Sequence, residues 1–279
     1  MRPLALIGAA ALLSGCGASS VGNLEPRRDA IPVLAYRGDV KTEVLERHLE
    51  LLDDAEYDTI GLDKLIGHLR GERVSLPPRP FVLTFDGGRA STLDAEETLE
   101  RHGYKATLFT DVGRVAAGDR RYLGWDELTG LRRFDVQLQS GTGNHVMRWG
   151  PGPGDVGSFY AYRGHEEVVG GWRERVFGDI SWAERQLARR GFRPVAIAPP
   201  GGNYGQAGTN DPEIPRLLLQ RLRLSFALVF TLDRPPLAVR GAGTMRPIGR
   251  LDMTAPGAER RLRELVREAP SSATDTVPR

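Results

Sequence analysis

The chain has 279 residues, of which 40% are hydrophobic and 27% charged, a composition that supports a buried core and excludes a largely disordered protein. The formal net charge is +2, and acidic and basic residues interleave without a basic stripe, which argues against a nucleic-acid partner. The single cysteine excludes an internal disulfide.

The N-terminus has the pattern of an export signal. Arg2 gives a positive start, residues 4–13 form a short apolar segment, and Ser14 and Gly15 precede Cys16. Ten apolar positions are too few to span a bilayer as a helix, and the segment is similar to a bacterial lipoprotein signal. That similarity implies cleavage before Cys16 and lipid attachment to it, whereas a chance cysteine in an ordinary signal peptide is the alternative. We therefore expect a signal peptide over 1–15, a tether over 16–30 and an exported protein that is lipid-anchored at the bacterial cell envelope.

Strand and helix patterns alternate from residue 31 onward. Apolar runs predict strands near 31–36, 57–62, 81–86, 106–110, 136–140, 195–198, 226–230 and 245–248. Helical spacing of apolar residues predicts helices near 45–52, 62–69, 91–103, 125–133, 172–187, 214–222 and 257–267. A Gly/Pro-rich loop is expected over 141–164. Repeated strand and helix units without a linker predict one α/β barrel-like domain over 31–268, followed by a flexible tail over 269–279.

Asp86 is the first candidate site residue. It ends the apolar run from Phe81 and is followed by Gly87 and Gly88. Because α/β folds gather functional side chains at the carboxyl ends of strands, Asp86 is expected to lie in a site. The alternative is that Asp86 only caps the turn that follows.

Five segments together resemble the polysaccharide deacetylase family, also called the NodB homology domain or carbohydrate esterase family 4. The resemblance covers about 31–251 and rests on residues 33–36, 83–86, 105–109, 138–142 with His145, and 198–202. It implies a deformed (β/α) barrel that removes acetyl groups from N-acetylated sugars with a divalent metal, usually zinc. N-acetylated polysaccharide is thus the implied partner.

The family's metal-ligand positions are altered in this chain. In the family pattern Thr-Phe-Asp-Asp-Gly, Asp86 matches the general base and Gly87 stands at the ligand position. In the pattern His-Ser/Thr-x-x-His, Gly141 stands at the first histidine and only His145 remains. A catalytic zinc generally needs three protein ligands, so we expect a degenerate site without a cofactor. A site for zinc or another divalent metal rebuilt from Asp86, His145 and either His165 or Glu166 is the alternative.

Other positions are candidates for substrate contact. The resemblance places Tyr36 and Gly201 in the site, where the backbone N–H of Gly201 is a candidate oxyanion donor. Tyr204 follows a strand end, and Trp149 and Tyr162 are loop aromatics that suit stacking against sugar faces. The structural alternatives are that Trp149 and Tyr162 only pack the loop onto the barrel and that Tyr204 only stabilises the Gly/Pro turn.

Three functions remain in competition. The residues favour a deacetylase-like envelope lipoprotein that binds N-acetylated polysaccharide without metal-dependent deacetylation. The second interpretation is an active deacetylase with Asp86 as base and a rebuilt metal site. The third is a glycosidase in which Asp86 pairs with Glu166, Glu167 or Asp126.

The deacetylase family's proton donor is a histidine late in the domain. No histidine of this chain lies after His165.

Overall fold

The computed structural model describes residues 30–268. The predicted signal peptide, the lipidation site at Cys16, the tether up to residue 29 and the tail over 269–279 lie outside these residues. Within residues 30–268, no helix is long and apolar enough to cross a membrane.

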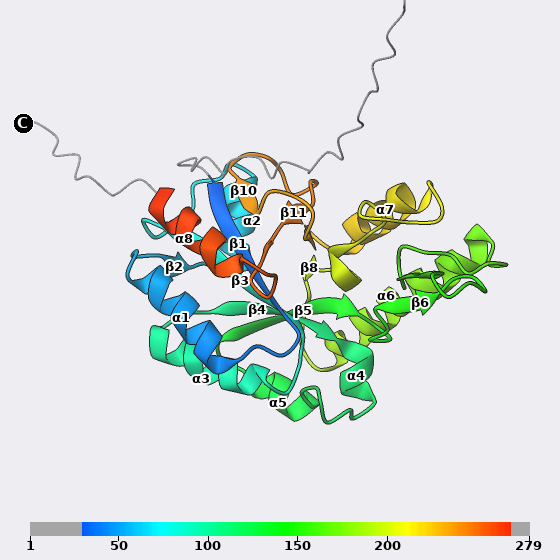
Figure 1. Ribbon diagram of the computed structural model, residues 1–279, viewed down its shortest axis with the longest axis horizontal. Helices are drawn as coiled ribbons and strands as arrows, with labels where there is room; N and C mark the ends of the chain where they lie inside the picture. The colour runs from blue at the N-terminus through cyan, green and yellow to red at the C-terminus, as the bar shows by residue number, and fades with distance from the viewer. Residues whose placement is uncertain (1–29, 269–279) are drawn as a thin grey trace, which may run out of the picture.

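A nearly closed sheet forms the centre of the molecule, with the helices arranged around it (Figure 1). Its strands follow the order β10-β1-β3-β4-β5-β8-β9-β11, while β12 pairs with β1 and β2 pairs with β3. All pairings in this sheet are parallel except that of β10 with β1. These strands are β1 (Ala30–Arg37), β2 (Asp58–Thr59), β3 (Pro80–Gly87), β4 (Ala106–Asp111), β5 (Phe134–Ser140), β8 (Ala196–Ile197), β9 (Leu228–Thr231), β10 (Leu237–Val239), β11 (Ile248–Gly249) and β12 (Leu251–Asp252). The predicted deformed (β/α) barrel is confirmed.

One short segment joins the two ends of the sheet. β11 pairs with β9, β12 pairs with β1, and only Arg250 separates β11 from β12. The backbone around Arg250 therefore closes the barrel.

Helices connect most of the strands. They are α1 (Thr42–Asp53), α2 (Leu62–Leu69), α3 (Thr92–His102), α4 (Val112–Ala116), α5 (Trp125–Gly130), α6 (Val169–Arg189), α7 (Ile214–Ser225), α8 (Ala258–Glu268) and the 3-10 turn η1 (Pro200–Gly202). α1 packs against α3 and α8, and α6 packs against α4 and β5.

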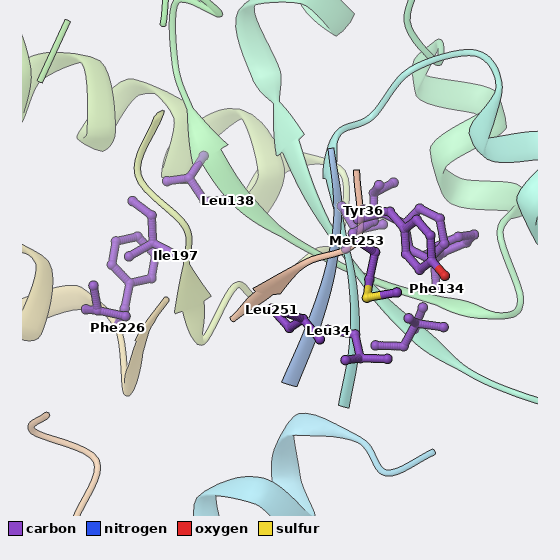
Figure 2. Close-up of a cluster of buried hydrophobic side chains, with 14 of the residues drawn as sticks. Leu34, Tyr36, Phe134, Leu138, Ile197, Phe226, Leu251 and Met253 are labelled. Carbon is purple, nitrogen blue, oxygen red and sulfur yellow. The ribbon is translucent and has the colours of Figure 1, made fainter. Parts of the chain in front are cut away.

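Two buried clusters use opposite faces of the strands, because successive strand residues point to opposite sides. Val82, Phe109 and Phe230 belong to an inner cluster that draws on β1, β3, β4, β8, β9, β10 and β11 and on α2. Leu34, Leu138 and other strand residues, shown in Figure 2, pack outward in a second cluster that includes residues of the helices. Since Thr84 and Asp86 follow Val82 at every second position, they share its face and lie at the carboxyl end of the barrel interior.

The shortest elements differ from prediction. The strand expected over 57–62 shrinks to β2, and the loop expected over 141–164 contains a hairpin of β6 (Val146–Arg148) and β7 (Val156–Ser158). β10 and β12 were not predicted. Strands of two or three residues are too short for apolar alternation to show, so tertiary pairing decides them.

The two ends of α3 differ in their capping. Gly103 ends α3 in the left-handed conformation with φ of 73°. Ser91 does not cap α3 with its side chain, because its Oγ donates to Asp39 Oδ1 at 3.0 Å instead.

His102 joins α3 to α1 through two carboxylates. Its Nε2 lies 3.1 Å from Glu46 Oε1, its Nδ1 bonds Asp53 Oδ2, and Arg101 also pairs with Glu46. Its side chain is only 10% exposed. Burial alone would lower the pKa of His102, but the hydrogen bonds and charges of Asp53 and Glu46 outweigh burial and raise the pKa.

This cluster predicts a pH dependence of stability. Because the pKa is higher in the folded chain than the usual value near 6.5, the stabilisation is complete below that value and is lost as pH rises through the folded pKa. We expect His102→Gln to lower the free energy of unfolding by about 1 kcal/mol more at pH 5.5 than at pH 8.5. Urea unfolding at both pH values measures this, with the exposed His165→Gln as control. An equal loss at both pH values would contradict it.

Candidate functional site

A pocket of about 170 Å³ opens at the carboxyl ends of β3, β4 and β5. Parallel strands that end side by side bring their last side chains to the same edge. The pocket is lined by Arg37, Gly38, Asp86, Gly87, Arg89, Asp111, Tyr122, Gln139, His145 and Gly201.

Asp86 is held in a buried ion pair with Arg250. Arg250 donates from both terminal nitrogens, to Asp86 Oδ1 at 2.6 Å and to Oδ2 at 3.0 Å, and also to Thr84 Oγ1 at 3.1 Å. The side chains of Arg250 and Asp86 are 0% and 5% exposed, and the guanidinium lies over the ring of Phe109 at 5.3 Å. Bidentate, charge-assisted bonds of this kind fix a carboxylate strongly. Asp86 therefore points into the pocket with both oxygens already engaged.

Asp111 and His145 form a second pair in the pocket. Asp111 ends β4, and its Oδ1 accepts a hydrogen bond from Ser140 Oγ at 2.6 Å and lies 2.9 Å from His145 Nε2. Burial would lower the pKa of His145, but the hydrogen bond and charge of Asp111, with the charge of Asp86, raise the pKa. His145, the histidine that matches the family's metal-binding pattern, is thus engaged with a carboxylate.

The two glycines at the other ligand positions are set by their backbone surroundings. Gly87 has φ of +104°, a conformation that side-chain-bearing residues rarely adopt. A Cβ at Gly141 would lie 2.4 Å from the backbone oxygen of Asp179 and 2.6 Å from its Oδ1. Asp179 is fixed there, because its Oδ2 accepts from Gly141 N at 2.8 Å and from Tyr160 Oη at 2.6 Å. A histidine at 141 would require this packing to change.

The residues of the pocket do not fit a catalytic divalent metal. Both oxygens of Asp86 and the Nε2 of His145 are bonded within the chain, and Gly87 and Gly141 offer no side-chain donor. Within residues 30–268, no group of three or more His, Cys, Asp or Glu side chains is placed to hold a metal ion.

The alternative acidic and histidine residues lie elsewhere. His165 and Glu166 are exposed and do not line the pocket, so the alternative ligand set with Asp86 and His145 is not assembled. Glu167 pairs with Arg175, and neither Glu167 nor Asp126 lines the pocket. The carboxylate pairs nominated for a glycosidase are therefore not brought together there.

Tyr36 lies in the core and not in the pocket. We expected it to contact substrate, but it is 1% exposed, stacks on Phe85 and bonds His48 Nδ1 through its hydroxyl at 2.8 Å. It belongs to the outward-packing cluster of Figure 2 because its position in β1 points away from the barrel interior.

Of the other predicted contact residues, one lines the pocket and three do not. Gly201 lines the pocket. Tyr204 is buried in the outward-packing cluster, its hydroxyl accepts a bond from Arg234, and it does not line the pocket. Trp149 and Tyr162 stack on each other at 6.0 Å between ring centres, are half-buried, and are not among the pocket-lining residues.

Several pocket residues escaped the sequence analysis. Asp111 and Gln139 lie at the ends of predicted strands, so the rule that singled out Asp86 applied equally to them. Arg250 could not be recognised by the same rule. The strand before it, β11, is only two residues long, and its partner Asp86 is 164 positions away in the sequence.

The fold and the site permit comparison with known proteins. No family model matches the chain, and no curated protein matches its sequence. Solved structures do match. A de-N-acetylase from Aggregatibacter actinomycetemcomitans superposes with a TM-score of 0.68 at 18% identity, over 84% of this chain and 100% of that one. IcaB from Ammonifex degensii gives 0.62 at 18% identity over 84% and 96%, and the Streptococcus pyogenes deacetylase PplD, in complex with acetate, gives 0.61 at 15% identity over 87% and 99%.

These matches define the architecture. The chain has the fold of the polysaccharide deacetylases, in the deformed-barrel form that the sequence predicted. At identities of 15–18% this likeness concerns the fold alone.

The Asp86–Arg250 pair predicts an asymmetric mutational response. Arg250→Met leaves a buried carboxylate without its counter-charge and is expected to lower the free energy of unfolding by about 3–5 kcal/mol. The double variant Arg250→Met with Asp86→Leu removes both charges and is expected to recover most of that loss. Urea unfolding of the wild type, both single variants and the double variant measures the coupling. Additive losses would show that the two side chains do not depend on each other.

Proposed function

We propose that this chain binds N-acetylated polysaccharide in the pocket beside Asp86 and does not deacetylate it through a metal. The main support is that the groups that could bind a metal are already engaged within the chain. Asp86 and His145 are already paired with Arg250 and Asp111, and Asp179 occupies the space that a ligand side chain at Gly141 would need. The ligand class is supported by the solved proteins of the same fold, which include a de-N-acetylase and a deacetylase in complex with acetate.

The pocket has groups that suit a sugar. Guanidinium, amide and imidazole side chains from Arg37, Arg89, Gln139 and His145 offer several donors within a small volume. Arg89 is fixed by two bonds to Asp39 and lies over the ring of Tyr122 at 4.8 Å. A preorganised donor of this kind loses little conformational freedom when it bonds a hydroxyl.

A sugar titration tests the proposal. Isothermal titration of the protein with the hexamer of N-acetylglucosamine is expected to give a Kd on the order of 1 mM, which corresponds to about −4 kcal/mol. Arg89→Met is expected to weaken binding about tenfold because it removes a fixed donor from the pocket wall. Arg121→Met is the matched control, because Arg121 is an exposed arginine that pairs with Asp119 and does not line the pocket.

Metal analysis and acetate release separate binding from catalysis. After incubation with zinc and dialysis, we expect substoichiometric metal and no acetate from the same hexamer. Stoichiometric metal, with acetate release that Asp86→Asn abolishes, would establish an active deacetylase instead. Absence of sugar binding by the wild type would remove the proposed ligand.

We also propose that the chain is exported and lipid-anchored at the cell envelope through Cys16. The support is the apolar N-terminal segment followed by Ser14, Gly15 and the only cysteine of the chain. Expression in a bacterium with a radiolabelled fatty acid is expected to label the wild type and not Cys16→Ala. Equal labelling of both proteins, or of neither, would contradict the anchor.

A further inference from the structure

Gln139 is a buried amide in the pocket wall. It lies in β5, is 1% exposed, and its Oε1 accepts no hydrogen bond from any group of residues 30–268. Among the described residues that line the pocket, no other buried side-chain polar atom is left unpaired. An unpaired buried acceptor costs about 1–3 kcal/mol, so it calls for a partner that arrives from outside the chain.

A second glutamine on the same strand shows what a structural amide looks like. Gln137 Oε1 accepts from the backbone nitrogens of Val195 and Ala196 at 2.7 and 2.8 Å, and its Nε2 donates to Asp135 at 2.9 Å. Gln137 thus links β5 to the start of β8 by hydrogen bonds. Gln139, two residues further on the same face, makes none of these bonds and lies at the pocket instead.

The ionised groups of the pocket are already neutralised by counter-charges within the chain. Each lining arginine and carboxylate has an internal partner, so none needs an ionic ligand. The pairs are Arg37 with Asp252 at 3.0 Å, Arg89 with Asp39 at 2.6 Å, Asp86 with Arg250 at 2.6 Å, and Asp111 with His145 at 2.9 Å. The amide of Gln139 is neutral. The buried polar atom that is left unpaired among the lining residues is therefore uncharged and suits an uncharged hydrogen-bonding group.

We propose that Gln139 is the specificity-determining residue of this pocket and that its amide bonds a hydroxyl or acetamido N–H of an uncharged sugar unit. This inference rests on the proposed sugar-binding function and narrows it to neutral sugars. The unpaired Oε1 accepts the hydroxyl or N–H proton. Charged sugars carry the same hydroxyl donors, but a carboxylate or an ammonium group also brings a charge that has no free counter-ion in the pocket.

The experiment compares three trimers and three proteins. Wild type, Gln139→Met and the matched control Gln137→Met are titrated with trimers of N-acetylglucosamine, glucosamine and galacturonic acid, which are neutral, cationic and anionic. We expect the wild type to bind the neutral trimer at least about tenfold more tightly than either charged one. Gln139→Met is expected to weaken binding of the neutral trimer about tenfold and to leave the charged trimers nearly unchanged.

Thermal unfolding separates a ligand contact from a structural role. Because Gln139→Met removes an unpaired buried acceptor, its melting temperature is expected to equal or exceed that of the wild type. Gln137→Met breaks three internal bonds and is expected to lower the melting temperature while keeping the wild-type preference for the neutral trimer.

The outcomes are distinct. Wild-type affinity in Gln139→Met, or a fall in its melting temperature like that of Gln137→Met, would overturn the assignment of Gln139 while leaving sugar binding intact. Equal affinity of the wild type for neutral and charged trimers would overturn the preference for neutral sugars. A wild type that binds none of the trimers would remove the proposed function and this inference together.

Discussion

The ion pair between Asp86 and Arg250 is the interaction on which the pocket depends. Arg250 lies between β11 and β12, in the backbone that closes the barrel, and Asp86 lies near the end of β3 on the other side of β1. Both side chains are buried, so neither charge has water as a substitute partner. The residue at which the barrel closes therefore also orients the pocket carboxylate.

The same pairing principle extends around the pocket wall. Asp111 is matched by His145, and the exposed Asp39 and the half-buried Asp252 match the two arginines that line the opening. A pocket whose charges are matched internally has little need of a cation. It retains donors and one unpaired acceptor, which is the chemistry of hydrogen-bonded recognition.

Gly87 and Gly141 are part of the backbone packing around the pocket. Gly87 uses a left-handed φ, and Gly141 approaches Asp179 so closely that a Cβ does not fit. Asp179 in turn holds Tyr160, which is fully buried. A side chain at position 141 therefore requires a different backbone path beside Asp179.

The sequence by itself determined the alternation of strands and helices, the barrel class and the strand-end position of Asp86, because apolar runs and turn residues are local signals. The sequence also indicated that Gly87, Gly141 and His145 stand at the positions that correspond to the family's metal ligands. It did not reveal that Tyr36 faces the core, that Asp111 holds His145, or that the loop over 141–164 contains a hairpin. Only the tertiary structure decided that Asp86 pairs with Arg250, since 164 residues separate them and only closure of the barrel brings them together.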